Sequence, residues 1–127
     1  MADVFRIGNL AVSRGEVKRG AIEAGVDMAG SPRQTPIIVV HGAQDGPRLW
    51  LNGATHGDEP EGPLSIFWAL QQVDPRQLRG TIVGVPAMNV PGFTAGTRGD
   101  PLDTFSYDMN RVYPGKPDGY PTERVAY

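Results

Sequence analysis

Two side chains with metal-binding chemistry stand three residues apart in the segment His56-Gly57-Asp58-Glu59 of this 127-residue chain. Imidazole nitrogen and carboxylate oxygen are natural zinc ligands, and a catalytic zinc commonly takes two histidines, one glutamate and a water. A plainer interpretation is that Glu59 stabilises the positive end of a helix and that His56 is an ordinary loop residue. The spacing of the two residues alone leaves both interpretations open.

Four further residues have side chains that could bind a substrate or a metal. In the segment Asp108-Met109-Asn110-Arg111, the planar fork of Arg111 could bind a carboxylate, and Asn110 could add an amide donor. Arg98 could bring positive charge to a developing oxyanion. Each arginine could equally be a solvated loop residue, with Asn110 forming a turn. His41 ends a predicted strand without a suitably spaced partner, which is more typical of a half-buried residue than of a metal ligand.

The hydrophobic pattern upstream of these residues predicts strands. Apolar runs at 36–41 and 48–52, separated by the turn signal Asp45-Gly46, predict a β-hairpin spanning 36–55.

The period changes after this segment. Apolar residues at helical spacing predict a helix over about 60–73 with Asp58 as its cap, and the run 81–85 predicts a buried strand. Strand, helix and strand in this order predict a parallel βαβ unit with a right-handed crossover. We therefore expect His56 and Glu59 at the carboxyl end of a strand, where open α/β sheets bind ligands.

The remaining segments are less regular. Residues 3–30 alternate weakly between apolar and polar positions and are broken by glycines, which predicts short strands. Residues 86–121 hold six prolines and five glycines in 36 positions, which predicts a long loop that is either functional or a sign that part of the protein is missing. The segment 121–127 has the pattern of a helix start.

Composition excludes several classes of protein. A net charge of −2 does not suit a nucleic-acid binder that works by neutralising phosphates. No run of about 18 apolar residues predicts a membrane-spanning helix, and the first residues do not resemble a secretory signal. The chain has no cysteines and therefore no disulfide or thiolate zinc site. We expect a cytoplasmic protein that binds neither membrane nor nucleic acid.

Three motifs, taken together and in order, are more specific than any of them alone. The segments 53–62 (GATHGDEPEG), 86–93 (PAMNVPGF) and 108–115 (DMNRVYPG) resemble the succinylglutamate desuccinylase/aspartoacylase family, which belongs to the zinc carboxypeptidase-like group. The resemblance covers about 35–127 and implies an α/β fold, a truncated zinc-carboxypeptidase-like mixed sheet flanked by helices. Residues 1–34 are similar to a small N-terminal β extension of bacterial members.

The resemblance also implies roles for particular residues. It implies that His56 and Glu59 are the first two ligands of one Zn²⁺ per site, that Asn110 and Arg111 hold the substrate carboxylate, and that Arg98 polarises the scissile carbonyl. In the family, the third ligand is a histidine on a strand beyond the last helix matched here, and the catalytic glutamate lies further on. We expect both outside this chain, which would make it the N-terminal part of a longer enzyme.

The expected activity is hydrolysis of the amide bond of an N-acyl amino acid or a related small carboxylate, carried out by the longer protein. The 127-residue chain alone is expected to be inactive. Two alternatives stay open. One is a non-catalytic folded fragment that assembles with copies of itself through an unfinished sheet. The other is a metal-free carboxylate-binding module that uses Arg111.

Overall fold

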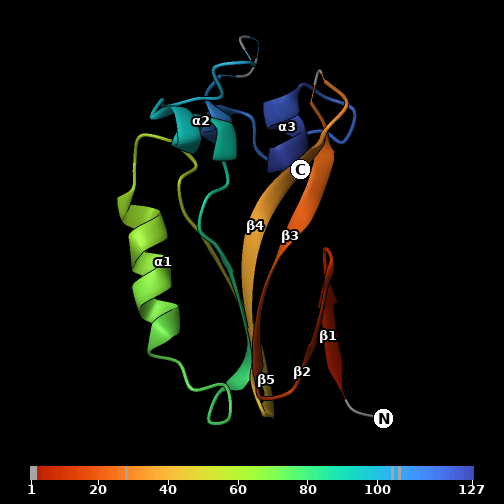
Figure 1. Cartoon of the computed structure of the whole chain (residues 1–127), viewed down its shortest axis with the longest axis vertical. Coiled ribbons are helices and arrows are strands. Elements are labelled where there is room, and N and C mark those ends of the chain that lie inside the picture. Colours follow the sequence, from red (N-terminus) through yellow and green to blue (C-terminus); the bar gives the residue numbers. More distant parts are fainter. Residues whose placement is uncertain (1–2, 28, 104, 106) are drawn as a thin grey trace.

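The computed structural model describes residues 3–27, 29–103, 105 and 107–127 (Figure 1). The strands are β1 (Val4–Ile7), β2 (Leu10–Ser13), β3 (Glu16–Val26), β4 (Pro32–His41), β5 (Gln44–Asn52) and β6 (Arg79–Val85). The helices are α1 (Glu61–Gln71), α2 (Val90–Ala95), the 3₁₀ helix η1 (Met109–Arg111) and α3 (Pro121–Ala126). Among the residues so described, no helix is both long and apolar enough to cross a bilayer.

Four of the strands form one mixed sheet in the order β3-β4-β6-β5. β4 runs antiparallel to both of its neighbours, whereas β5 and β6 run parallel and are joined through α1. The predicted parallel βαβ unit and the α/β class with a mixed sheet are therefore confirmed.

The predicted hairpin over 36–55 is wrong, because β6 lies between its two arms. Val83 of β6 is paired with Val39 of β4 on one side and with Trp50 of β5 on the other. β6 is apolar on both faces, and a central place in the sheet buries both of them. β5 begins with polar residues and contains Pro47, which has no N–H to donate and therefore suits an outer strand.

Helix α1 falls within the predicted range of 60–73, but its first turn differs from the prediction. The N-cap is Pro60 and it makes no side-chain hydrogen bond, so the assignment of Asp58 as the cap is wrong. The chain enters the helix through Pro60, whose φ of −75° already suits a helical turn. The helix buries the side chains that recur on one of its faces: Pro63, Ile66 and Leu70.

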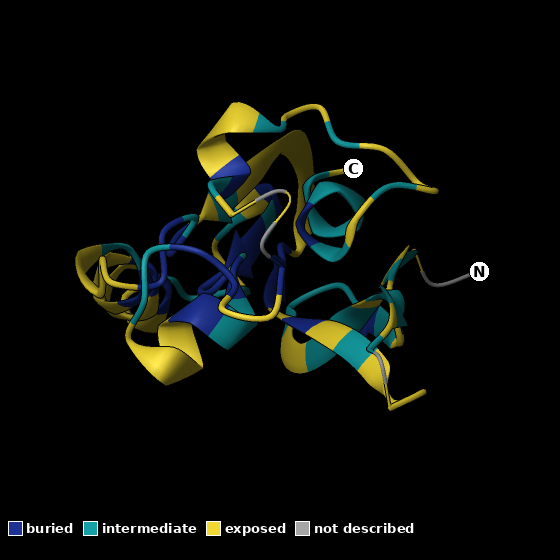
Figure 2. Cartoon of the chain, turned by 90° about the horizontal axis from the view of Figure 1, so that it is seen from above, coloured by how far each residue is buried: buried dark blue, intermediate teal, exposed yellow. Residues whose placement is uncertain are grey.

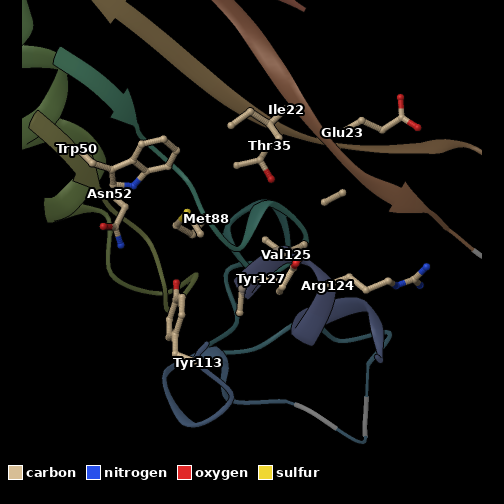
Figure 3. A pocket seen from close by; sticks show the side chains of 12 residues that line it. Ile22, Glu23, Thr35, Trp50, Asn52, Met88, Tyr113, Arg124, Val125 and Tyr127 are labelled. Carbon is tan, nitrogen blue, oxygen red and sulfur yellow. The ribbon is translucent and has the colours of Figure 1, made fainter. Parts of the chain in front are cut away.

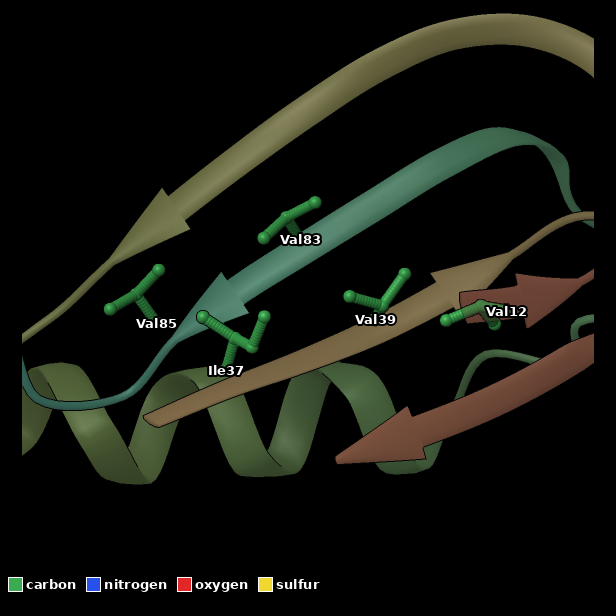
Figure 4. Packing of buried hydrophobic residues seen from close by; sticks show 5 residues of the cluster. All are labelled: Val12, Ile37, Val39, Val83 and Val85. Atoms are coloured by element: carbon green, nitrogen blue, oxygen red, sulfur yellow. The ribbon is translucent and has the colours of Figure 1, made fainter. Parts of the chain in front are cut away.

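Two apolar clusters, one on each face of the sheet, form the core because alternate residues of a strand point to opposite sides. Figure 2 shows that the buried segments, in dark blue, lie toward the centre of the molecule. The cluster beneath α1 contains Ile38, Val40, Ile66 and Leu70. The cluster on the other face contains Val12, Ile37, Val39, Val83 and Val85 and is partly covered by β1 and β2 (Figure 4).

The N-terminal region contributes to both sheets. β1 and β2 form a separate two-stranded sheet, whereas β3 pairs with β4 from Glu16 opposite His41 to Glu23 opposite Gln34. The suggested division of the chain into 1–34 and 35–127 stays a prediction. The predicted loop over 86–121 contains α2 and η1, and its residues 104 and 106 lie outside the described part of the chain. Helix α3 confirms the helix start that was predicted at 121–127.

Candidate active site

The turn that leaves β5 carries His56 into the protein. Gly53 still belongs to the sheet, since its N–H donates to the carbonyl of Val85 at 2.9 Å. The next residue, Ala54, has a φ of 42°, a left-handed conformation that costs a non-glycine residue on the order of 1–3 kcal/mol. His56 follows this turn and is only 8% exposed. A strained backbone at the end of a strand is the kind of feature that clusters at functional sites.

The loop after β5 packs directly against α2 and the segment that follows it. A Cβ atom on Gly57 would lie 2.1 Å from a backbone carbon of Gly92, so that only glycine fits this contact. The Gly57 N–H donates to the carbonyl of Arg98 at 3.0 Å, and the side-chain amide of Asn89 donates to the same oxygen at 3.3 Å. These two bonds fix Arg98 beside the loop.

The imidazole of His56 lies between two carboxylates. Its Nδ1 is 3.0 Å from Oε1 of Glu59, and its Nε2 is 2.8 Å from Oδ1 of Asp108. Glu59 lies just before α1, and Asp108 lies 52 residues after His56, just before η1. His56 thus joins two loops at the carboxyl end of β5.

Arg98 completes a cluster of four charged or ionisable side chains. Its Nη1 lies 3.5 Å from Oε1 of Glu59, and its Nε lies 3.4 Å from Oδ2 of Asp108. The hydrogen bond from His56 is the main reason why the pKa of Asp108 lies below its ordinary value of 3.8, while partial burial opposes this effect. The N–H of Asn110 and the charges of His56 and Arg98 lower the pKa of Asp108 further.

The donor set of the cluster suits zinc in part. Ligand atoms in tetrahedral zinc sites lie about 2.0–2.2 Å from the ion and hence roughly 3.3 Å from each other. Nδ1 of His56 and Oε1 of Glu59, 3.0 Å apart, fit as two adjacent ligands. Asp108 occupies the opposite nitrogen of the ring. Within the described residues, no group of three or more His, Cys, Asp or Glu side chains could hold a metal ion.

His41 lies far from this cluster in the fold. It ends β4 opposite Thr81, which lies in the first half of β6, so it stands at the opposite end of the sheet from His56. Its Nδ1 lies 2.9 Å from the hydroxyl of Thr81. His41 is 6% exposed and packs its ring against Phe5. The structure therefore gives it the surroundings of a core residue.

The predicted carboxylate-binding pair lies on η1. Asn110 and Arg111 are both exposed. The backbone N–H of Asn110 donates to Oδ1 of Asp108 at 3.0 Å, which places the pair directly after the cluster. The structure thus brings together His56, Glu59 and Arg98, whereas Asn110 and Arg111 adjoin that group through the backbone.

Asp108 is the residue of the cluster to which sequence reasoning gave no role. It stands in the motif at 108–111, and an aspartate before a helical turn is a common N-cap. Its side chain does cap η1. That signal predicts the contact with Asn110, but nothing local predicts the contact with His56.

A cavity of about 480 Å³ opens on the other side of the loop, between the sheet and α3 (Figure 3). Trp50, Met88 and Tyr113 are among the side chains that line it, and no residue of the His56 cluster does. Burial raises the pKa of the Tyr113 phenol, and an interaction with the side chain of Thr55, next to His56, opposes this shift. The cavity is thus connected to the cluster but separate from it.

Comparison with known proteins identifies the family. Residues 45–127 match the succinylglutamate desuccinylase/aspartoacylase catalytic domain. The chain belongs to this family. The resemblance noted from the three motifs is thereby confirmed.

Relatives with names or structures agree with this assignment. The N-alpha-acetyl-L-2,4-diaminobutyric acid deacetylase of Halomonas elongata is 38% identical over 91 residues, which are 72% of this chain and 26% of that protein. The product-bound structure of the ectoine utilization protein EutE (DoeB) from Ruegeria pomeroyi matches with a TM-score of 0.78 and 30% identity, covering 98% of this chain and 37% of that one. A succinylglutamate desuccinylase/aspartoacylase from Rhodobacter sphaeroides matches with a TM-score of 0.76 and 30% identity, covering 87% and 33% of the two chains. The chain therefore spans about a quarter to somewhat over a third of the length of these relatives.

Proposed function

We propose that this chain is part of a zinc-dependent deacylase that hydrolyses the amide bond of an N-acyl amino acid. The observation that carries the proposal is the position of His56, held by Asp108 so that its Nδ1 faces Glu59 at 3.0 Å. The family supports the reaction class, because the named relatives remove acyl groups.

In this proposal, His56 and Glu59 hold the zinc. When bound, zinc supplies Lewis-acid chemistry and makes water nucleophilic near neutral pH. Hydrolysis adds the water oxygen to the acyl carbon and breaks the bond from that carbon to nitrogen, and the amine leaves with a proton. Arg98, 42% exposed beside Glu59, offers positive charge where the carbonyl oxygen becomes negative.

Substrate orientation is assigned to η1. Asn110 and Arg111 would hold the carboxylate of the amino acid, since the guanidinium fork matches a carboxylate in bidentate geometry. The Halomonas relative is named for N-alpha-acetyl-L-2,4-diaminobutyric acid, which makes that compound the first substrate to test. The family resemblance assigns the third zinc ligand and the general base to a longer polypeptide, here called the intact protein.

The test measures acetate release from this substrate by the intact protein, with and without a chelator, together with its zinc content. We expect chelator-sensitive turnover, and His56→Ala should lose both zinc and turnover. Arg111→Ala should raise KM about 10- to 100-fold with zinc content unchanged, the loss of one charge-assisted carboxylate contact. Arg19→Ala, an exposed arginine on β3, is the matched control and should change neither quantity.

The rival functions predict different results. Full turnover by a zinc-free protein would refute the proposal that the reaction depends on zinc. Carboxylate binding that depends on Arg111, with neither zinc nor turnover in the intact protein, would instead identify a carboxylate-binding module. Absence of turnover, zinc and carboxylate binding in a folded protein would favour the non-catalytic alternative.

A further inference from the structure

We propose that Arg33 of β4 is a positioning residue for the proposed reaction: through a buried ion pair with Asp100, it holds the segment that carries Arg98 beside the candidate metal ligands. The inference rests on the proposed function, since it concerns the arginine that would stabilise the oxyanion. It gives the strands that precede the matched catalytic domain, which begins at residue 45, a part in the active site.

The ion pair joins two distant parts of the chain. Nη1 of Arg33 lies 2.7 Å from Oδ2 of Asp100, which stands 67 residues later. The Arg33 side chain is 13% exposed, and that of Asp100 is 3% exposed. The start of β4 and helix α2 lie at the same end of the sheet, which is also the end where β5 and β6 finish (Figure 1). Arg33 therefore ties the segment after α2 to the sheet at the end that carries the candidate site.

Stability alone does not explain this pair. Two charges lose hydration when they are buried, and apolar residues of similar volume often stabilise a protein as well or better. Nε of Arg33 is also buried without a hydrogen-bond partner among the residues that the structure describes. A short charge-assisted hydrogen bond does supply a fixed distance and direction, which an apolar contact would not. The pair is therefore suited to holding the segment after α2 in one place.

Arg98 lies two residues before this anchor. Its guanidinium lies 3.5 Å from Glu59 and 3.4 Å from Asp108, which is longer than the roughly 2.7–2.9 Å of charge-assisted hydrogen bonds. These side-chain contacts hold the guanidinium loosely, so its position depends on the backbone. The Gly57 N–H donates to the carbonyl of Arg98 at 3.0 Å on one side of the segment. The ion pair of Asp100 holds the other side.

The residue between Arg98 and the anchor is closely packed. A Cβ atom on Gly99 would lie 2.0 Å from the backbone oxygen of Tyr107, so the segment lies directly against the chain that leads into η1. Asp100 also accepts the N–H of Leu102 at 2.9 Å. The carboxylate that pairs with Arg33 therefore also closes the turn that follows.

Loss of Arg33 should affect the chemical step more than substrate binding. His56 and Glu59 belong to the loop after β5, so the candidate metal ligands should stay in place. Arg98 would act where charge develops in the transition state, so its displacement should lower kcat and leave KM largely unchanged. Removal of an oxyanion donor typically costs about 10²- to 10³-fold in kcat, and a displaced donor should cost less, about 10-fold.

Two variants remove the anchor. Arg33→Met keeps much of the side-chain volume but leaves the charge of Asp100 buried without its partner, which can itself destabilise the fold. Arg33→Met combined with Asp100→Asn leaves no unpaired charge and keeps an oxygen that can accept the Leu102 N–H. Arg14→Met is the matched control, because Arg14 forms an ion pair with Asp45 near the start of β5, at the opposite end of the sheet.

The first measurement is steady-state hydrolysis of N-alpha-acetyl-L-2,4-diaminobutyric acid by the intact protein, with zinc content determined on the same samples. Both variants without Arg33 should lower kcat about 10-fold and keep KM and zinc content within about 2-fold, whereas Arg14→Met should change none of the three. In an Arg98→Ala background, loss of Arg33 should lower kcat by no more than about 2-fold, because no guanidinium is left to position. A general loss of stability would not depend on Arg98 in this way.

The second measurement needs no turnover. Hydrogen exchange at the Gly57 amide reports whether the carbonyl of Arg98 is held in place. Exchange at the Val83 amide, in the central strand β6, serves as the reference for opening of the whole sheet. Relative to Val83, exchange at Gly57 should be about 10-fold faster in both variants without Arg33 and unchanged in Arg14→Met.

The outcomes separate this inference from the proposed function. If both variants without Arg33 keep the kcat of Arg14→Met, or if loss of Arg33 costs as much in the Arg98→Ala background as in the unmodified protein, the positioning role is refuted while the proposed function stands. If the unmodified protein has no turnover, the proposed function fails, and exchange at Gly57 decides whether Arg33 anchors the segment. Faster exchange then supports the anchor, and unchanged exchange refutes it.

Discussion

Substitution of Gly57 by alanine tests whether the loop after β5 is locked against α2. The added Cβ would lie 2.1 Å from a carbon of Gly92, 2.3 Å from the nitrogen of Phe93 and 2.4 Å from the oxygen of Thr97. All three are backbone atoms, and real Cβ atoms essentially never come within 3.0 Å of such neighbours. The strain cannot be relieved by rotating a side chain, so α2 and the loop must separate.

The expected cost lies at the upper end of that for overpacking, about 3 kcal/mol, in a domain whose total stability is of the order of 5–15 kcal/mol. With a urea m-value of about 1.5 kcal/mol/M, the unfolding midpoint should fall by about 2 M.

Gly96→Ala is the matched control for this prediction. Gly96 ends α2 with a φ of 67°, and a Cβ there would meet nothing within 4 Å. Its substitution should therefore cost only the left-handed backbone conformation, roughly 1 kcal/mol. If urea unfolding followed by circular dichroism shows Gly57→Ala to be no less stable than Gly96→Ala, the close packing of this loop against α2 is wrong.

Three further predictions concern the core, the cluster and the apolar surface. The side chain of Ile37 is 1% exposed, so Ile37→Ala should lower the free energy of unfolding by about 2–5 kcal/mol in urea titrations. A loss below about 1 kcal/mol would contradict the place of Ile37 in the core. Folding lowers the pKa of Asp108, so the ionised carboxylate stabilises the protein at a pH above the pKa that Asp108 has in the unfolded chain. This stabilisation should be lost as the pH falls through the pKa of Asp108 in the folded protein. In chelator-treated protein, His56→Ala should raise this pKa, and an unchanged carboxyl carbon-13 titration would refute the bond between them. Trp68, 65% exposed on α1, should support self-association of the 127-residue chain, and Trp68→Glu should reduce it in sedimentation velocity, while Gln72→Glu adds the same charge nearby as a control.

Local pattern predicted the parts of the fold that depend on near neighbours in the chain. The apolar spacing in 60–73 located α1 to within two residues at its C-terminal end, because one helix face must cover the sheet. The change of period after β5 likewise located the parallel crossover to β6. The cap at Asp58 failed since a proline two residues later begins the helix without a side-chain bond.

The order of the strands could not be predicted from the same pattern. A hairpin of β4 with β5 and the insertion of β6 between them place the same residues in strands and satisfy the same alternation. The difference lies in contacts such as Val39 with Val83, which are distant in sequence and are favoured by burying both faces of β6. The pairing of β6 with both β4 and β5 depends on the whole sheet and cannot be predicted from the turn signal at 45–46.

In the candidate site, too, some residues can be predicted from their near neighbours in the chain and others only from distant contacts. His56 and Glu59 can be found from sequence because the turn that joins β5 to α1 is short and sets both side chains at one strand end. The connection from His56 to Asp108 crosses 52 residues. Arg98 is held beside the same loop by two hydrogen bonds to its carbonyl, one from the backbone N–H of Gly57 and one from the side-chain amide of Asn89. A motif therefore predicts which residue types meet a ligand, whereas packing between loops brings Asp108 and Arg98 to His56 and Glu59. Gly57→Ala acts on this packing alone: it leaves every side chain of the cluster in place in the sequence, but separation of the loop from α2 should displace Arg98 from Glu59.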